Sequence, residues 1–262
     1  MGIREYRRKA DLSACYSLHT GFCMTVRASS RPLVRHRLMS LSEPLCKALR
    51  RRDTPSMLRP DYLHLWTLAR NMRLLCRGVG GGRILDVGCG DSPYRSFLPS
   101  DGVYVRLDSS PERHPDIVAD ARNMPIDSCS FDCVLCNQVI DFVGDPRGMI
   151  EECCRALKPG GRFIVSTPLL WPCENHARDR YRYTVWAMEE LLSSFADVRF
   201  LANGKAWQTA IQIWAYCFFH VLGAAGAPIY LLGNTIGRLP GMTPCDSLIT
   251  TGYTISARKL VH

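Results

Sequence analysis

The chain has 262 residues, of which 47% are hydrophobic, so it can bury the core of one α/β domain of ordinary size and carry additional segments. Its formal net charge of +9 comes from residues 1–59, which hold 13 Lys/Arg against 4 Asp/Glu, whereas residues 60–262 hold 20 of each. Thirteen cysteines would suit a secreted disulfide scaffold, but the N-terminus is basic and lacks an uninterrupted apolar segment. We therefore expect a cytoplasmic protein without a secretory signal or structural disulfides.

Residues 1–57 form the basic part of the chain and show little sustained periodicity, because arginines interrupt their apolar positions. We expect a basic N-terminal arm of short helices or disorder. Such an arm favours anionic partners, membrane lipid or nucleic acid, at about 1 kcal/mol per basic residue near an anionic bilayer. The alternative is a solvated leader that binds nothing.

From Leu58 onward the pattern becomes that of an α/β domain. Apolar residues recur every three or four positions up to Cys76, and Pro60 suits the first turn of a helix, which we expect to end near Gly78. Seven strands are predicted after it, over residues 84–87, 103–107, 116–119, 131–136, 162–166, 198–201 and 253–257. Helices are predicted between them over residues 94–98, 146–157 and 185–195. This alternation predicts a doubly wound, mostly parallel, seven-stranded sheet.

The stretch from Gly82 to Asp91 carries the strongest signal of a site. An apolar strand ends in Gly88-Cys89-Gly90, a tight turn that lets a ligand approach bare backbone. Asp86 lies inside this strand, and Asp108 ends the next strand 22 residues later. In nucleotide-binding α/β sheets, an acidic residue about 20 residues after the glycine-rich turn, at the end of the second strand, binds ribose hydroxyls. Asp108 is therefore a candidate ribose ligand. The alternative for both carboxylates is turn capping.

Together with later motifs, this stretch resembles the class I S-adenosylmethionine-dependent methyltransferases of the type 11 branch. The motifs stand in the expected order over residues 82–200, namely Ile84–Gly90, Asp108, Asp120-Ala121, Met124-Pro125-Ile126, Ser130-Phe131-Asp132 and Leu157–Phe163. The resemblance implies a Rossmann-like methyltransferase fold with S-adenosyl-L-methionine as cofactor. It implies that the two glycines admit the amino-acid end of the cofactor, that Asp86 fixes the backbone or the amino group, and that Asp108 binds the ribose.

The candidate cofactor-binding residues are Asp86, Gly88, Cys89, Gly90, Asp108, Ser109, Asp120, Ala121 and Asn137. In the resembling family, Asp120 and Ala121 would lie at the adenine edge. Cys129, Cys133 and Cys136 lie along the fourth strand, where the alternation of side chains sends them to different faces of the sheet, so we expect no metal site there.

The acceptor side is predicted first from the end of the fourth strand. Residues 137–142 stand where relatives often carry an adjacent Glu-His pair. Here Asp141 keeps a carboxylate, and Phe142 removes the imidazole. This departure argues against a histidine base at that place.

A second acceptor-side stretch is Asp179–Thr184, which is similar to an Asp-Tyr-Tyr-Arg-(Phe/Tyr)-Thr signature of type 11 methyltransferases linked to bacterial surface-glycan assembly. Those relatives usually carry two histidines upstream, whereas this chain has a single shifted His176. For O-methylation a hydroxyl must lose its proton, and the candidate catalytic residues are Asp141, His176 and Asp179, in no firm order. The alternative is that Asp179, Arg182 and Tyr183 brace the following helix.

Residues 206–237 contain no Asp, Glu, Lys or Arg and form an apolar helical insertion before the last strand. A Gly/Ala/Pro run at 223–228 divides the insertion, and Gln208, Gln212, Tyr216 and His220 recur at every fourth position of its first half. We expect a membrane-surface hairpin, with Trp207, Trp214 and Tyr230 at headgroup depth. Helices packed against the core or a second copy, and a spanning segment, are the alternatives.

The expected domains are the arm 1–57, a methyltransferase core 58–205, the insertion 206–244 and the last strand of the core in 245–262. The leading hypothesis is an S-adenosylmethionine-dependent methyltransferase that O-methylates a glycan or lipid-linked sugar at the cytoplasmic membrane face. Alternatives are a methyltransferase of a quinone or other lipophilic small molecule, and a non-catalytic cofactor-binding scaffold. A nucleic-acid substrate is disfavoured, because no Asn/Asp-Pro-Pro-aromatic motif follows the fourth strand.

Overall fold

The computed structural model describes residues 16–17, 23–24, 51–173, 179–239 and 248–261. The chain divides into two compact units, Met1–His36 and Arg37–His262. In the first unit, strands β1 (Tyr16–Ser17) and β2 (Cys23–Met24) pair antiparallel. Most of the predicted arm, 1–57, lies outside the described residues.

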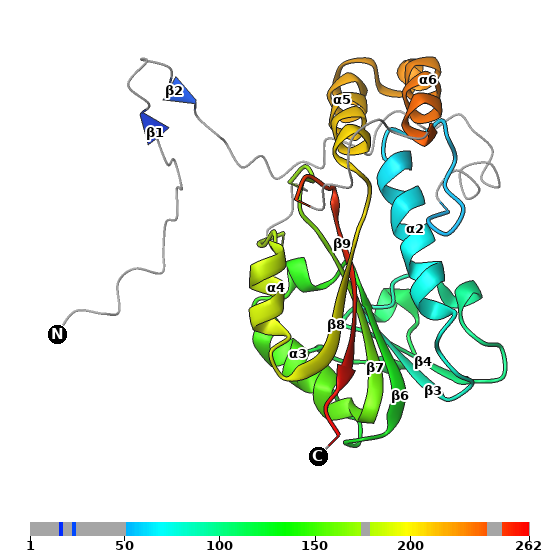
Figure 1. Cartoon of the computed structure of the whole chain (residues 1–262), viewed down its shortest axis with the longest axis vertical. Helices are drawn as coiled ribbons and strands as arrows, with labels where there is room; N and C mark the ends of the chain where they lie inside the picture. Colours follow the sequence, from blue (N-terminus) through cyan, green and yellow to red (C-terminus); the bar gives the residue numbers. More distant parts are fainter. Residues whose placement is uncertain (1–15, 18–22, 25–50, 174–178, 240–247, 262) are drawn as a thin grey trace. The chain divides into compact units, whose positions relative to one another are not determined.

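The second unit is built on a single seven-stranded sheet, coloured from cyan to red in Figure 1. Its strands are β3 (Arg83–Val87), β4 (Val103–Asp108), β5 (Ile117–Val118), β6 (Phe131–Asn137), β7 (Leu157–Pro168), β8 (Phe195–Ala202) and β9 (Gly252–Lys259). The spatial order is β5-β4-β3-β6-β7-β9-β8, and β9 runs antiparallel to both of its neighbours while the other pairs are parallel. The predicted doubly wound, mostly parallel sheet is therefore confirmed.

The helices are α2 (Tyr62–Cys76), α3 (Pro146–Ala156), α4 (Val185–Leu191), α5 (Ala206–Leu222) and α6 (Ala227–Arg238). Short 3₁₀ turns are η1 (Arg95–Phe97), η2 (Pro111–Arg113), η3 (Ile140–Phe142) and η4 (Gly223–Gly226). Asp145 caps α3 by accepting from Gly148 N at 3.0 Å, and Thr184 caps α4 by accepting from Ala187 N at 3.3 Å. The helix predicted over residues 185–195 is too long, because Phe195 already pairs with Lys259 in the sheet.

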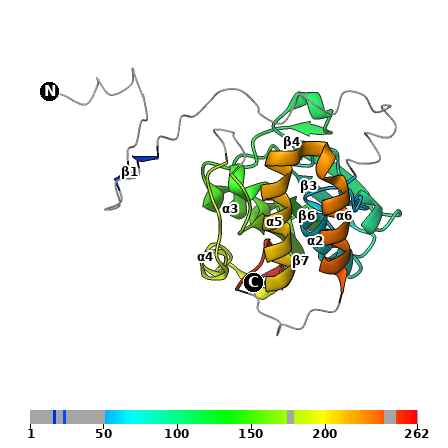
Figure 2. The same ribbon diagram turned by 90° about the horizontal axis from the view of Figure 1, so that it is seen from above.

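Helices cover both faces of the sheet, as the view in Figure 2 shows. One face, with Ile84, Leu135 and Ile164, packs against the apolar side of α2. The intervening residues of the same strands point the other way, into a core with α3 and α4. This strict alternation makes the central strands apolar on both faces, as expected for a buried parallel sheet.

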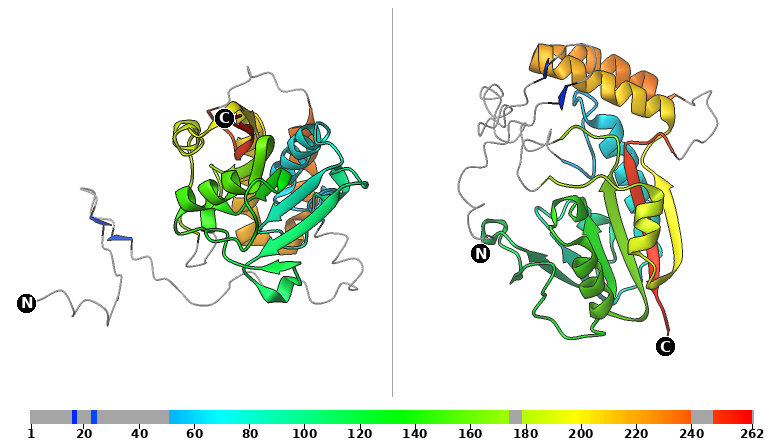
Figure 3. Two further views of the ribbon diagram at one scale, coloured as in Figure 1. Left: turned by 90° about the horizontal axis from the view of Figure 1, so that it is seen from below. Right: turned by 90° about the vertical axis from the view of Figure 1, so that its left-hand side faces the viewer.

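Helices α5 and α6 form an antiparallel hairpin beyond the upper end of α2, shown in orange in Figure 3. Polar side chains tie this hairpin to the start of α2. Gln212 accepts from His64 N at 3.0 Å and donates to Pro60 O, and Asn234 donates to Met57 O at 2.7 Å. The first part of the polar row predicted on α5 therefore faces the domain, since Gln208 and Gln212 are both buried, whereas His220 at its end is exposed.

Candidate functional site

The turn after β3 is shaped by two glycines with left-handed backbone. Gly88 has φ +67° and Gly90 has φ +51°, and the N–H groups of Gly88 and Cys89 both donate to Leu107 O, at 2.8 and 3.1 Å. A Cβ on Gly88 would collide with the side chain of Val139, whereas a Cβ on Gly90 would meet no atom within 4 Å. Gly88 is thus required for packing, and Gly90 borders open space at the carboxyl end of the sheet.

Asp108 points at this turn. Its Oδ2 accepts from Gly90 N at 3.0 Å and its Oδ1 accepts from Ser110 N at 2.9 Å. A carboxylate has about four lone-pair sites, so these two bonds fix its orientation and leave acceptor capacity for a ligand. Turn capping and ligand binding, which the sequence poses as alternatives, are compatible at this residue.

Asp86 lies in β3, just before the turn, and is 6% exposed. Its carboxylate accepts from the hydroxyl of Tyr104 on β4. Burial raises the pKa of Asp86 to about 6, and the hydrogen bond from Tyr104 acts against that rise. The site therefore holds a carboxyl group that titrates near neutrality, a common property of functional positions.

The remaining candidate cofactor residues lie around the same edge of the sheet. Ala119 N donates to Asp108 O at 3.1 Å, which brings Asp120 and Ala121 beside Asp108. Asp120 is exposed and pairs with Arg122, whose guanidinium lowers the pKa of this carboxyl.

Three smaller members of that set differ in their surroundings. Cys89 is buried, and burial raises the pKa of its thiol to about 11, so it is not a reactive thiolate. Ser109 is exposed beside Asp108. Asn137 accepts from Ser166 Oγ at 2.6 Å, which commits its side-chain oxygen to β7.

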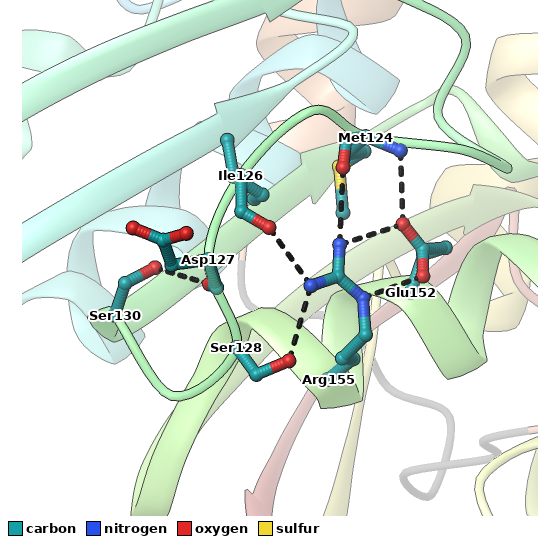
Figure 4. Close-up of polar contacts among 7 residues, drawn as sticks. All are labelled: Met124, Ile126, Asp127, Ser128, Ser130, Glu152 and Arg155. Atoms are coloured by element: carbon teal, nitrogen blue, oxygen red, sulfur yellow. Dashed lines mark hydrogen bonds and ion pairs between the residues drawn. The ribbon is translucent and has the colours of Figure 1, made fainter.

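The loop that carries Asp120 is braced by a polar network that the sequence does not reveal (Figure 4). Arg155 of α3 donates to Met124 O at 3.0 Å and to Ile126 O at 2.8 Å. Glu152 pairs with Arg155 and accepts from Met124 N at 2.9 Å. Since both residues look like ordinary helix-surface charges in the sequence, only the fold shows that they set the path of this loop.

A pocket of about 170 Å³ lies on the acceptor side of the site. Its lining comes from α2 and the segment before it, the segment after β6 that includes η3, the end of β7 and the residues after it, the stretch before α4, and α5. The lining residues are Arg52, Asp61, His64, Leu65, Leu68, Gln138, Asp141, Phe142, Pro168, Trp171, Asp179, Arg182 and Tyr216. Val139, the residue after Gln138, is the one that packs against Gly88. The glycine turn and the pocket are therefore neighbours.

The structure places two of the three predicted catalytic residues, Asp141 and Asp179, in this pocket, and His176 lies outside the described residues. Asp141 is buried, and its carbonyl accepts from Arg180 N at 3.1 Å and Tyr181 N at 3.3 Å. Arg182 donates to Asp179 Oδ2 at 2.9 Å and to Pro172 O at 3.2 Å. The Asp179–Arg182 ion pair that the bracing alternative requires is present, and both side chains also line the pocket.

Three aromatic pocket residues are missed by the sequence analysis. The ring of His64 stacks on Trp171 with centroids 4.1 Å apart, and Tyr216 meets Trp171 edge-on at 5.1 Å. Tyr216 belongs to the polar row of α5, which was a usable signal, but His64 stands in an apolar helical pattern with nothing to single it out.

A larger pocket, of about 290 Å³, lies between residues 78–82 and the starts of β6 and β7. Ligands of open α/β sheets bind at the carboxyl ends of the strands, so this pocket is not the candidate site. Among the residues that the structure describes, no group of three or more His, Cys, Asp or Glu could hold a metal ion.

The fold and the turn define a nucleoside-binding α/β protein of the methyltransferase type. The family model described as a methyltransferase domain, type 11, matches residues 85–165. A demethylmenaquinone methyltransferase of Clavibacter sepedonicus is 30% identical over 183 residues, which cover 62% of this chain and 74% of that protein. The chain belongs to the S-adenosylmethionine-dependent methyltransferase family, in its type 11 branch, and its cofactor is S-adenosylmethionine.

A ubiquinone biosynthesis O-methyltransferase of Xylella fastidiosa is 32% identical over 105 residues, which cover 34% of this chain and 43% of that protein. The chain thus spans less than half the length of that relative. Among solved structures, a methyltransferase of Thermotoga maritima matches with TM-score 0.50 and 15% identity over 76% of this chain and 92% of its own. The cyclase SpnF matches with TM-score 0.50 and 19% identity over 74% of this chain and 82% of its own. The fold is therefore shared with a protein named for a different reaction.

Proposed function

We propose that this protein transfers a methyl group from S-adenosylmethionine to a hydroxyl of a glycan or lipid-linked sugar at the cytoplasmic membrane face. The observation that carries the proposal is the pocket beside the glycine turn, because five of its 13 lining residues are charged and three are aromatic or imidazole rings of the Trp171 stack. Sugar rings present several hydroxyls and apolar C–H faces. Such a ligand needs both carboxylate or guanidinium partners and a stacking surface.

The donor side of the site suits the cofactor. We assign the amino-acid end of S-adenosylmethionine to the space beside Gly90, the ribose to Asp108 and the adenine edge to Asp120 and Ala121. Support comes from the open space at Gly90 and from the orientation of Asp108, which two backbone donors fix. When bound, the cofactor supplies a methyl group on a sulfonium. The protein then holds the acceptor in line and excludes water, which accounts for roughly 7 to 11 kcal/mol of a barrier.

On the acceptor side we assign hydroxyl binding to Asp141 and Asp179. Arg182 fixes the position of Asp179 by pairing with it. These carboxylates orient neighbouring hydroxyls of the sugar. Asp141 lies on η3 and Asp179 on the stretch before α4, and the carbonyl of Asp141 links the two segments by accepting from Arg180 N and Tyr181 N.

Membrane contact is assigned to the hairpin of α5 and α6. Its outward side carries exposed apolar residues, namely Ile213, Trp214, Val221, Leu222, Leu231, Leu232, Ile236 and Leu239. By hydropathy the continuous helical stretch Ala206–Arg238 is a candidate membrane span, with only 17% of its most apolar window buried. However, α5 has 17 residues and α6 has 12, and a spanning helix needs about 20, so a hairpin lying on the surface fits better.

Of the three aromatic residues expected at headgroup depth, the structure contradicts one. Tyr230 is 1% exposed, and its hydroxyl donates to Gly223 O at 2.7 Å, closing the hairpin. Trp214 is 43% exposed and remains an interfacial candidate.

The proposal is tested with radiolabelled S-adenosylmethionine and a bacterial membrane extract that contains lipid-linked sugars. We expect label in a lipid-extractable product that mild acid converts to a water-soluble methylated sugar. Label that stays in the organic phase after acid would reject the sugar. Calorimetric binding of S-adenosylhomocysteine with no labelled product would instead indicate a non-catalytic scaffold.

A companion experiment measures sedimentation with vesicles of mixed zwitterionic and anionic lipid. The variant Val221→Ser/Leu232→Ser should bind vesicles at least several-fold more weakly than the parent, because each buried apolar side chain contributes about 1.5 to 3 kcal/mol. Leu74→Ser, at an exposed apolar residue on α2, serves as the control. Equal binding of all three proteins would exclude the hairpin as the membrane contact.

The second candidate acceptor is a quinone precursor or another lipophilic small molecule. Two curated relatives favour it by name, the ubiquinone biosynthesis O-methyltransferase and the demethylmenaquinone methyltransferase. The density of charge in the pocket disfavours a ring with few polar groups. Acid-stable label in a lipid that absorbs as a quinone after oxidation would establish this alternative.

A further inference from the structure

The tautomer of His64 follows from the hydrogen bonds around it. Thr251 Oγ1 lies 2.9 Å from His64 Nδ1 and 2.6 Å from Asn203 O. The carbonyl of Asn203 can only accept, so the single proton of the Thr251 hydroxyl is committed to it. The proton between Thr251 and the imidazole must therefore come from the ring. Nδ1 carries the proton, and Nε2 has a free lone pair.

A buried network holds this arrangement in place. Asn203 is fully buried, and its Oδ1 accepts from Asn71 Nδ2 at 2.9 Å and from Thr254 Oγ1 at 2.7 Å. These bonds join α2 to strands β8 and β9 around the residue that orients Thr251. Exchange of the tautomer would leave a buried donor or acceptor unpaired, which costs about 1 to 3 kcal/mol.

His64 lines the acceptor pocket and stacks on Trp171. Among the residues that the structure describes, only Nδ1 of this ring has a hydrogen-bond partner, so Nε2 is the ring nitrogen left for a ligand. Burial lowers the pKa of His64 to about 4, and this keeps the ring neutral throughout the physiological range. The charged groups facing the pocket from its other walls are Arg52, Asp61, Asp141, Asp179 and Arg182.

We propose that His64 is the catalytic base of this site, and that its Nε2 accepts the hydrogen bond and then the proton of the acceptor hydroxyl. The inference rests on the proposed function and deepens it, because it restricts the acceptor to a group that carries a hydrogen. An ether, a ketone or an aromatic carbon at that position would leave Nε2 unpaired.

The step balances in atoms and electrons. The hydroxyl oxygen forms a bond to the methyl carbon, the carbon–sulfur bond breaks, and its electron pair stays on sulfur. The hydroxyl proton moves to Nε2, giving an imidazolium whose Nδ1–H still donates to Thr251, and is later released to water. A weak base suffices, since the oxygen becomes strongly acidic only as the methyl arrives.

The tautomer is measured without any acceptor. In protein labelled with ¹⁵N-histidine, two-bond proton–nitrogen spectra at pH 7 should show His64 with Nδ1 protonated and Nε2 bare, and with no protonation above about pH 5. The variant Thr251→Val should lose this tautomer preference. An Nε2-protonated ring, or a ring that titrates at pH 6 to 7, would overturn the inference whatever the acceptor is.

Activity is measured on the membrane extract with His64→Asn, since the Asn amide can replace Nδ1–H as donor to Thr251 while Nε2 is lost. We expect a fall in rate of about 10²- to 10³-fold, as for loss of a positioned base. Affinity for S-adenosylhomocysteine should not change. The parent rate should stay level from pH 8 to 6 and fall only as pH approaches 4.

Glu189→Gln, an exposed change on α4, controls for handling. If His64→Asn keeps the parent rate and pH profile, the inference fails while the proposed function stands. If the parent protein binds S-adenosylhomocysteine but labels no product, the proposed function fails, and the spectra alone decide whether the tautomer is as inferred.

Discussion

At the scale of single residues, Asp108 shows how one carboxylate can shape a turn and still keep acceptor capacity for a ligand. Two backbone N–H groups fix its orientation, and both come from turns that follow parallel strands. The sequence could predict this residue because its place at the end of the second strand follows from topology. Its hydrogen bonds to the turn could not be predicted, since they depend on the φ angles of Gly88 and Gly90.

Asp108→Asn is expected to weaken binding of S-adenosylhomocysteine by about 10- to 100-fold, because hydrogen bonds to a charged group contribute about 1.5 to 3 kcal/mol. Isothermal titration calorimetry measures this affinity. Asp127→Asn, an exposed carboxyl on the loop before β6, should bind like the parent protein. Equal affinities of the Asp108 variant and the parent would remove Asp108 from the ribose site.

Asp86 is expected to make the stability of the folded protein fall as pH rises, which is the opposite of the effect of a salt-bridged carboxyl. Burial raises its pKa from 3.8 to about 6, so the folded state holds the proton more tightly than the unfolded state. The ionised carboxylate therefore destabilises the folded state. This loss of stability is absent below the pKa of Asp86 in the unfolded chain and complete above its pKa in the folded protein. A rise of this size corresponds to roughly 3 kcal/mol.

Asp86→Asn removes this titration. The free energy of unfolding of the variant, relative to the parent protein, should therefore increase by about 2 to 3 kcal/mol between pH 4 and pH 7. Urea denaturation at several pH values measures the difference. A difference that is constant over this range would mean that Asp86 has an ordinary pKa.

At the scale of elements, the strands could be predicted well and their ends less well. The central strands are apolar on both faces, so their period is clear, whereas β7 begins five residues before the predicted Arg162 because Leu157 already pairs with Phe131. The insertion was predicted as a hairpin from its Gly/Ala/Pro run. The side of α5 that faces the domain is set by the partners of Gln212, which lie about 150 residues away in the sequence. The local sequence pattern cannot reveal such distant partners.

The acceptor pocket was predictable only where the chain resembles its family. Asp141 and Asp179 stand in recognisable stretches, whereas His64 lies on an apolar helix and becomes a pocket residue only when Thr251 and Trp171 are placed beside it. The loop carrying Asp120 is a similar case. Its shape depends on Arg155, a residue on a separate helix.

Arg155→Met is expected to loosen this loop, because two backbone carbonyls lose a charged donor. The affinity for S-adenosylhomocysteine should fall by about 3- to 10-fold, a loss of roughly 1 kcal/mol transmitted from a residue without ligand contact. Hydrogen exchange should speed up over residues 120–126. The control is Arg147→Met on the same helix, whose ion pair with Glu190 is exposed. Equal losses in both variants would mean a general effect on α3.

At the scale of the whole second unit, the acceptor pocket joins parts of the chain that are far apart in sequence. Helix α2 supplies His64, the sheet supplies Gln138 and Pro168, and α5 supplies Tyr216. Buried amide side chains attach the hairpin to the start of α2. The surface that we propose for membrane contact and one wall of the pocket therefore belong to the same hairpin. The attachment of this hairpin to α2 should govern both.

The variant Gln212→Ala/Asn234→Ala tests this attachment. In the parent protein, thermal unfolding followed by tryptophan fluorescence, which includes Trp207 and Trp214 of the hairpin, should coincide with unfolding followed by far-ultraviolet circular dichroism. In the variant, the hydrogen bonds of the hairpin to Pro60 O and Met57 O are lost, and His64 N loses its acceptor. Each buried group left unpaired costs about 1 to 3 kcal/mol of stability. The fluorescence transition should then precede the loss of the sheet.

Thr235→Ala, on the exposed side of α6, should keep the transitions together. Coincident transitions in the double variant would show that apolar contacts alone hold the hairpin, and that its attachment does not control the pocket.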